Sequence, residues 1–162
     1  AANAKGARVI IAEPSKERAE VAKKLGAEAV FDPSAADAVE QAMKLTDGIG
    51  ATVVFEASGK PQAMAMTLEV AAFRARLVNI GIDVGGSATA KLGLIQSKEL
   101  QVRGIIGSPG VWPETIRFLA RTGIDLSPLV TKQFDISEAA AAYDAVLTDK
   151  SQIKVHVQSS AQ

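Results

Sequence analysis

A carboxylate at the end of an apolar strand is the first feature of this sequence that could do chemistry. Residues 9–12 are continuously apolar and rich in branched side chains, as in a parallel strand covered on both faces. Glu13 and Pro14 close that run, and Ser15 is then placed to cap a helix. In a dinucleotide-binding fold, an acidic residue here accepts hydrogen bonds from the adenosine ribose hydroxyls and repels a ribose 2′-phosphate. The sequence therefore predicts half of a nucleotide site, with a solvated surface carboxylate as the alternative.

Three further predicted strands end in turns that bear on the same chemistry. Their ends are residues 56–59, 80–82 and 105–107, and each contains a glycine. Ligands of open parallel sheets bind outside the carboxyl ends of the strands, and glycine lets a flat ligand approach the backbone without meeting a Cβ. Each glycine alone could serve only its own turn, but their joint placement favours a ligand site.

The elements that must position these ends alternate along the chain. This alternation predicts right-handed crossovers and a doubly wound α/β fold with a parallel sheet. The predicted strands are residues 8–12, 28–31, 52–55, 75–80, 100–106, 129–134 and 153–157. The predicted helices are residues 15–25, 35–46, 61–73, 90–97, 113–121 and 136–147, the last capped by Ser137.

Composition excludes several classes of partner. The 18 basic and 18 acidic side chains cancel, which gives no electrostatic reason to expect nucleic acid or an anionic membrane. No apolar run is long enough to span a bilayer and no signal peptide opens the chain, so we expect a cytoplasmic location. With no cysteine and one histidine, His156, the chain cannot form a disulfide or a zinc site of the usual ligands. We expect His156 to be a surface residue of the last strand.

Several motifs together carry a resemblance that covers nearly the whole chain. They are Arg8-Val9-Ile10-Ile11-Ala12-Glu13 with Arg18, Leu25-Gly26-Ala27, Val53-Val54-Phe55-Glu56-Ala57-Ser58-Gly59, Leu77-Val78-Asn79-Ile80-Gly81, Lys98-Glu99-Leu100 with Gly104, and Ile153-Lys154-Val155. In this order the sequence resembles the cofactor-binding domain of the zinc-dependent medium-chain alcohol and polyol dehydrogenases, such as sorbitol, butanediol and threonine dehydrogenases.

The resemblance implies roles for the adenosine side of a coenzyme site. Glu13, followed by Pro14, matches the acidic ribose-binding position, and Arg18 matches a basic residue near the same ribose. Lys154 matches a basic residue near the pyrophosphate, with an exposed lysine on an edge strand as the alternative. The turn that passes beneath the adenosine half is matched by Ala57, Ser58 and Gly59.

The resemblance also implies a nicotinamide side. The backbone carbonyl of Ile105 and the amide of Gly107 match the groups that hold the carboxamide. The segment that lies against the nicotinamide ring is matched by Ile80, Gly81 and Ile82. No residue of this chain matches a catalytic or metal-binding position of the family.

Two departures from the family limit these roles. The glycine-rich phosphate loop and its preceding strand are absent, as is the catalytic domain with its zinc ligands, so we expect the chain by itself to be inactive. The predicted fold is therefore a Rossmann-type doubly wound parallel sheet that lacks its first strand and glycine-rich loop, with residues 1–158 as an incomplete dinucleotide-binding domain and 159–162 as a tail. In the strand order 3-2-1-4-5-6, this loss leaves a gap of roughly 10 Å at the sheet centre. We expect either a segment outside this numbering to fill the gap or the flanking strands to close onto each other.

The functional prediction is the NAD-binding portion of a zinc-dependent dehydrogenase of secondary alcohols or polyols. Glu13 favours NAD over NADP, zinc is expected only in the missing catalytic domain, and that domain would bind the small-molecule alcohol. A homo-oligomer is expected through the strand at residues 100–106, since relatives pair there. A zinc-free quinone or enoyl reductase relative and a non-catalytic nucleotide-sensing or interaction module remain as alternatives.

Overall fold

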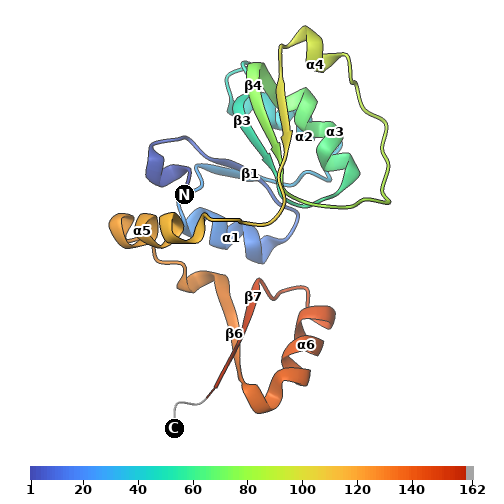
Figure 1. Cartoon of the computed structure of the whole chain (residues 1–162). Helices are drawn as coiled ribbons and strands as arrows, with labels where there is room; N and C mark the ends of the chain where they lie inside the picture. The colour runs from blue at the N-terminus through green and yellow to red at the C-terminus, as the bar shows by residue number, and fades with distance from the viewer. Residues whose placement is uncertain (160–162) are drawn as a thin grey trace. The chain divides into compact units, whose positions relative to one another are not determined.

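A computed structural model describes residues 1–159 of the chain. Helices and strands alternate as predicted, and the α/β organisation is confirmed (Figure 1). The chain divides into two compact units, one made of residues 1–30 with the chain from Pro113 onward, the other of residues 31–112. Apart from Ser159, the predicted tail at residues 159–162 lies outside the described residues.

The second unit is a parallel sheet covered by helices. Its strands run in the order β3-β4-β5, and α3 packs against β3 and β4 while α2 packs against α3 (Figure 1). The strands are β3 (Ala51–Glu56), β4 (Ala71–Asn79) and β5 (Gln101–Gly104), and the helices are α2 (Ala38–Leu45), α3 (Pro61–Val70) and α4 (Leu94–Ser97). Because Val54, Leu77 and Val102 are at one level of the register, the carboxyl ends of all three strands meet at one edge.

The core of this unit consists largely of small side chains. Leu77 of β4 is only 1% exposed and is the largest fully buried side chain. The buried cluster around it comprises Leu68, Ala71, Ala72, Ala75 and Leu100. Alanines on β4 let α3 and the segment before β5 approach the strand closely, since each has only a methyl group.

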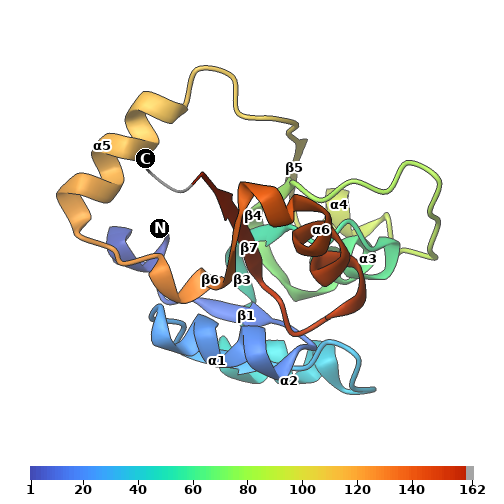
Figure 2. The same cartoon turned by 90° about the horizontal axis from the view of Figure 1, so that it is seen from below.

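The first unit contains two separate pairs of strands. β1 pairs with β2, while β6 and β7 form a parallel pair against which α6 packs (Figures 1 and 2). The predicted cap of α1 is confirmed, because the backbone N–H of Arg18 donates to Ser15 Oγ at 3.3 Å. The elements are η1 (Asn3–Lys5), β1 (Ile10–Ala12), α1 (Lys16–Lys24), β2 (Ala29–Phe31), α5 (Trp112–Thr122), η2 (Ser127–Leu129), β6 (Val130–Asp135), η3 (Ile136–Glu138), α6 (Ala139–Thr148) and β7 (Lys154–Gln158).

The strand neighbours agree with the predicted order and its missing member. The order 3-2-1-4-5-6 without its first strand leaves β2 beside β1 and, separately, β3, β4 and β5 in sequence, which are the pairings found. Within residues 1–159, β1 and β3 belong to different sheets.

Four predicted elements have other bounds in the structure. The helix predicted to reach Phe73 ends at Val70, and the strand predicted from residue 75 already begins at Ala71. The helix predicted at residues 90–97 is confined to Leu94–Ser97, and the strand predicted at 100–106 to Gln101–Gly104.

The predicted cap before α6 is also wrong. Asp135, not Ser137, caps the turn there, because its carboxylate accepts from the backbone N–H of Ser137 at 2.9 Å. Glu138 completes a capping box by accepting from the backbone N–H of Asp135 at 3.3 Å. A carboxylate is a strong cap acceptor, and here it begins a 3-10 turn that runs into the helix.

Candidate functional site

A buried carboxylate organises the carboxyl end of β3. Glu56 is 4% exposed, and its Oε1 accepts hydrogen bonds from the Ser58 backbone N–H at 2.8 Å, the Ser58 hydroxyl and the Gly59 N–H at 3.1 Å. Its backbone carbonyl accepts from the N–H groups of Ile80, at 2.7 Å, and Gly81, at 3.1 Å. One residue thus folds the turn that follows β3 and ties it to the end of β4.

Glu56 was predicted only as part of the strand end at residues 56–59, with no role of its own. The signal in the sequence was an acidic residue with serine two positions later and glycine three positions later. An acidic side chain in this position accepts hydrogen bonds from the backbone N–H groups of the residues that follow it.

Two glycines allow that turn to cross the end of β4. Gly59 has φ +72°, and a Cβ built there would lie 2.7 Å from the backbone nitrogen of Ile82. A Cβ on Gly81 would overlap the backbone of Gly59. The structure therefore brings Gly59, Gly81 and Ile82 together, as predicted, through direct contact of two backbones. Ala57 and Ser58 lie in the same turn and are exposed.

A pocket of about 370 Å³ opens beside this crossing, at the carboxyl ends of β4 and β5. Gly81, Ile82 and Ile105 of the predicted nicotinamide side line it together with Asn79, Met64 and Ile106. The Ile82 and Ile105 side chains are 58% and 49% exposed, so apolar surface is available to a flat ring. The predicted residues Ile80 and Gly107 do not contribute to the lining, in so far as the described chain defines it.

The predicted adenosine-side residues other than Ala57, Ser58 and Gly59 lie in the first unit. Glu13 is partly buried, and its Oε1 accepts from the Ser15 N–H at 2.9 Å, which leaves acceptor capacity on the carboxylate for hydroxyl donors. Arg18 is exposed, and its guanidinium donates to the carbonyl of Gln152 at 3.5 Å, two residues before Lys154. Pro14 and Lys154 are exposed, and Lys154 begins β7.

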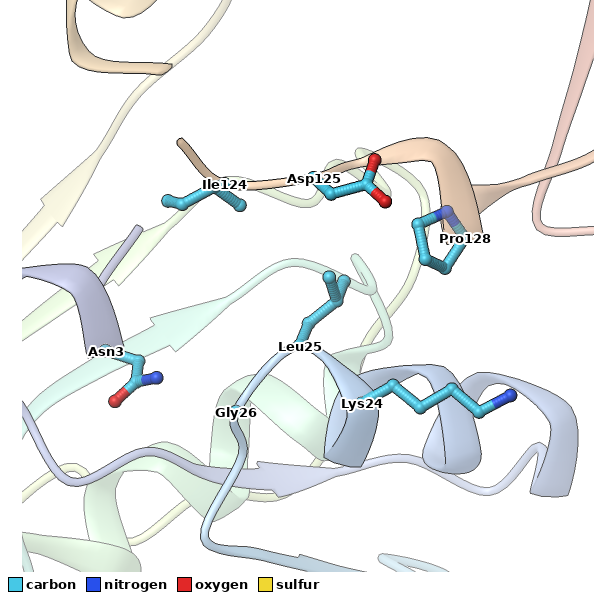
Figure 3. Close-up of a pocket in the computed structure, with 7 residues that line it drawn as sticks. All are labelled: Asn3, Lys24, Leu25, Gly26, Ile124, Asp125 and Pro128. Carbon is cyan, nitrogen blue, oxygen red and sulfur yellow. The ribbon is translucent and has the colours of Figure 1, made fainter. Parts of the chain in front are cut away.

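A second pocket, of about 340 Å³, lies within the first unit (Figure 3). None of its lining residues is a predicted site residue, and Leu25 points toward the segment that carries Ile124. Its acidic group is already satisfied, because the Ser127 backbone and hydroxyl groups bind Asp125 and lower the pKa of that carboxyl. We assign no ligand to this pocket.

Neither a metal-binding cluster nor a membrane-spanning helix is found in the part of the chain that the structure describes. No group of three or more histidine, aspartate or glutamate side chains there could hold a metal ion. No helix within residues 1–159 combines the length and the apolar character needed to cross a bilayer. His156 is exposed on β7, as expected.

Comparison with known proteins relates this chain to dehydrogenases. Residues 1–121 match a protein family described as "Zinc-binding dehydrogenase". The chain is 33% identical over 159 residues to scyllo-inosose 3-dehydrogenase of Thermotoga maritima, an alignment that covers 94% of this chain and 40% of the relative.

Solved structures show the same relationship. The crystal structure of 2R,3R-butanediol dehydrogenase from Bacillus subtilis is 28% identical with a TM-score of 0.86, covering 98% of this chain and 46% of that one. An alcohol dehydrogenase from Escherichia coli, solved with NADH, is 26% identical with a TM-score of 0.81, covering 91% of this chain and 43% of that one. These likenesses confirm the Rossmann-type fold, and the chain spans less than half the length of each of these relatives. The chain belongs to the zinc-binding dehydrogenase family.

Proposed function

We propose that this chain is the NAD-binding portion of a zinc-dependent dehydrogenase that acts on a secondary alcohol or polyol. The proposal rests on the turn after β3, which crosses the end of β4 at Gly59 and Gly81, and on the apolar pocket beside it. A flat ring fits such a pocket because Ile82 and Ile105 present exposed apolar surface at the strand ends. Further support comes from the relatives, which include dehydrogenases of a polyol derivative and a diol.

The residues of this chain would bind and orient the coenzyme. When bound, nicotinamide supplies the hydride acceptor or donor of the reaction. Ile82 and Ile105 would cover the ring and exclude water, and the backbone at Ile105 and Gly107 would hold its carboxamide. The described residues do not fit a zinc ion, and we place zinc and the alcohol site in the part of the relatives that this chain does not span.

We propose NAD rather than NADP as the coenzyme, because Glu13 would face the 2′-phosphate of NADP. Repulsion of a phosphate by one partly exposed carboxylate weakens binding by roughly 1 kcal/mol, about fivefold in affinity. Titration calorimetry with NAD and NADP measures this preference. It is applied to the chain itself and to a version fused to the strand and glycine-rich loop of the Bacillus subtilis relative.

Substitution of Glu13 tests the cause of the preference. Glu13→Gln should raise the affinity for NADP and leave the hydroxyl contacts of NAD largely in place, while Glu17→Gln on the adjoining helix serves as the matched control. NADP binding as tight as NAD in the unsubstituted protein would contradict the assignment. Binding of neither nucleotide by either version would favour the non-catalytic interaction module.

We also propose a cytoplasmic homo-oligomer for the whole protein. A composition without cysteine allows no disulfide and is compatible with a reducing compartment. The edge position of β5, whose four residues are all exposed, supports pairing with a second copy.

A further inference from the structure

Asn79 carries a polar group that the fold does not satisfy. It ends β4, the central strand, where its backbone carbonyl accepts from the Ile105 N–H at 3.0 Å. Its side-chain oxygen, Oδ1, is shielded from solvent and has no hydrogen-bond partner among the described residues. Buried polar atoms without a partner are rare in folded proteins because they lose their bonds to water and gain none.

The pocket lining beside Asn79 contains no side chain that could supply the missing bond. Asn79 lines the 370 Å³ pocket, where most of its neighbours are apolar, among them Met64, Ile82 and Ile106. The other polar side chain of the lining, Asp83, is an acceptor, and it already binds the backbone N–H of Gly86 at 3.0 Å.

Packing alone gives no reason for an amide at this position. Leu77 lies two residues earlier on the same face of β4 and is 1% exposed in the apolar core. A leucine or valine at position 79 would continue that face and leave no orphaned oxygen. The amide therefore points to a ligand in the pocket rather than to the fold.

We propose that the Asn79 side chain pairs with the carboxamide of the nicotinamide ring. This inference rests on the proposed function and adds a residue to it. An amide is matched by another amide, because each offers one carbonyl acceptor and N–H donors. The side-chain amide turns about its last bond at little cost, and such a turn brings Oδ1 out of its shielded position to face the pocket. The carboxamide of nicotinamide carries an N–H donor and a carbonyl acceptor on a flat ring. Its pairing with Asn79 would fix the rotation of that ring beside Ile82.

A coenzyme analogue isolates the proposed pair. In 3-acetylpyridine adenine dinucleotide an acetyl group keeps the carbonyl but lacks the N–H donor. The unsubstituted protein should bind NAD more tightly than the analogue, because the analogue cannot donate to Asn79 or to the Ile105 carbonyl. Asn79→Leu should weaken NAD roughly fivefold more than it weakens the analogue, the worth of one hydrogen bond, and should reduce the preference to the part that the Ile105 carbonyl supplies. Asn79→Asp keeps an acceptor for the N–H donor and should keep the preference.

A third probe, ADP-ribose, separates the failure of this inference from that of the proposed function. ADP-ribose lacks the nicotinamide ring, so Asn79→Leu should not change its affinity. Equal weakening of ADP-ribose and NAD would show a structural role and overturn the inference, as would an unchanged ratio of NAD to analogue affinity in Asn79→Leu. In both cases NAD binding and the proposed function stand. Failure of NAD and ADP-ribose to bind, with or without the fused glycine-rich loop, would refute the proposed function and this inference together.

Discussion

Two carboxylates at strand ends show how burial limits what a residue can bind. Glu13 is partly buried and uses one oxygen for its own turn, which leaves it able to bind a sugar. Glu56 is 4% exposed and is surrounded by donors from its own turn. The sequence shows the same pattern at both places, an acid after an apolar run. It could not separate a ligand-binding carboxylate from one that holds the backbone, because that difference depends on neighbouring elements.

Removal of the Glu56 carboxylate should destabilise the fold. In Glu56→Ala the N–H groups of Ser58 and Gly59 lose a buried charged acceptor, and the free energy of unfolding should fall by about 2 kcal/mol. Glu56→Gln keeps one carbonyl acceptor and should lose about half as much. Urea unfolding followed by circular dichroism measures both. Glu28→Gln is the control, since Glu28 is solvent-exposed and paired with Arg8 at the surface, and a loss equal to that of Glu56→Ala would contradict this account.

The strand-end residues that the structure brings together are those predicted from local backbone, and their roles toward a ligand stay predictions. Gly59, Gly81 and Ile105 follow from turns at strand ends, and the structure brings them to one edge of the sheet. Asn79 was quoted only as part of a motif. Its orphaned oxygen becomes visible only when the pocket around it is known, and no pattern along the chain reports it.

At the level of elements, the boundary between α3 and β4 is set by a contact from a distant part of the chain. The ammonium of Lys98 donates to the carbonyls of Leu68, Glu69 and Ala71 at 3.1, 2.9 and 2.7 Å, which satisfies the end of the helix. Arg74, with φ +59°, then donates its N–H to the Lys98 carbonyl at 2.7 Å. Helical periodicity through Phe73 could not reveal this, because the determining residue lies 27 positions or more away.

Replacement of Lys98 should weaken the end of α3. Burial lowers the pKa of Lys98 and Glu69 opposes that shift, yet the ammonium is the form that donates to three carbonyls. Lys98→Met keeps the apolar stem and removes the donors, and it should lower the free energy of unfolding by about 1 kcal/mol. Lys91→Met is the matched control, since Lys91 is exposed and forms only a surface ion pair with Glu69. Thermal unfolding measures both, and a larger loss for Lys91→Met would contradict the capping role.

At the level of the whole molecule, the sequence predicted the strand neighbours but could not show which strand edges would lack a partner. The pairings β1-β2 and β3-β4-β5 follow from a strand order that resembles the family, and the comparisons support that fold. Nothing in the pattern of residues 52–55 distinguishes a strand with two partners from one with a single partner. In the described chain, β3 has only β4 beside it.

Hydrogen exchange should report these edges strand by strand. Amides of β4 should exchange slowly because β4 has neighbours on both sides, whereas alternate amides of β3 should exchange fast. Outer amides of β5 should become protected as protein concentration rises, if β5 pairs with a second copy as proposed. The measurement is exchange followed by mass spectrometry at two protein concentrations, with β4 as the internal control. Protection of β3 equal to that of β4 would show that another segment pairs with it.

The alanine-rich core of the second unit has a thermodynamic consequence. Each buried alanine on β4 hides one methyl group, so unfolding exposes little new apolar surface to water. The increase in heat capacity on unfolding is therefore small for a unit of this size, because hydration of apolar groups supplies most of that increase. A small increase flattens the dependence of stability on temperature, so this unit keeps nearly the same modest margin from cold to warm conditions.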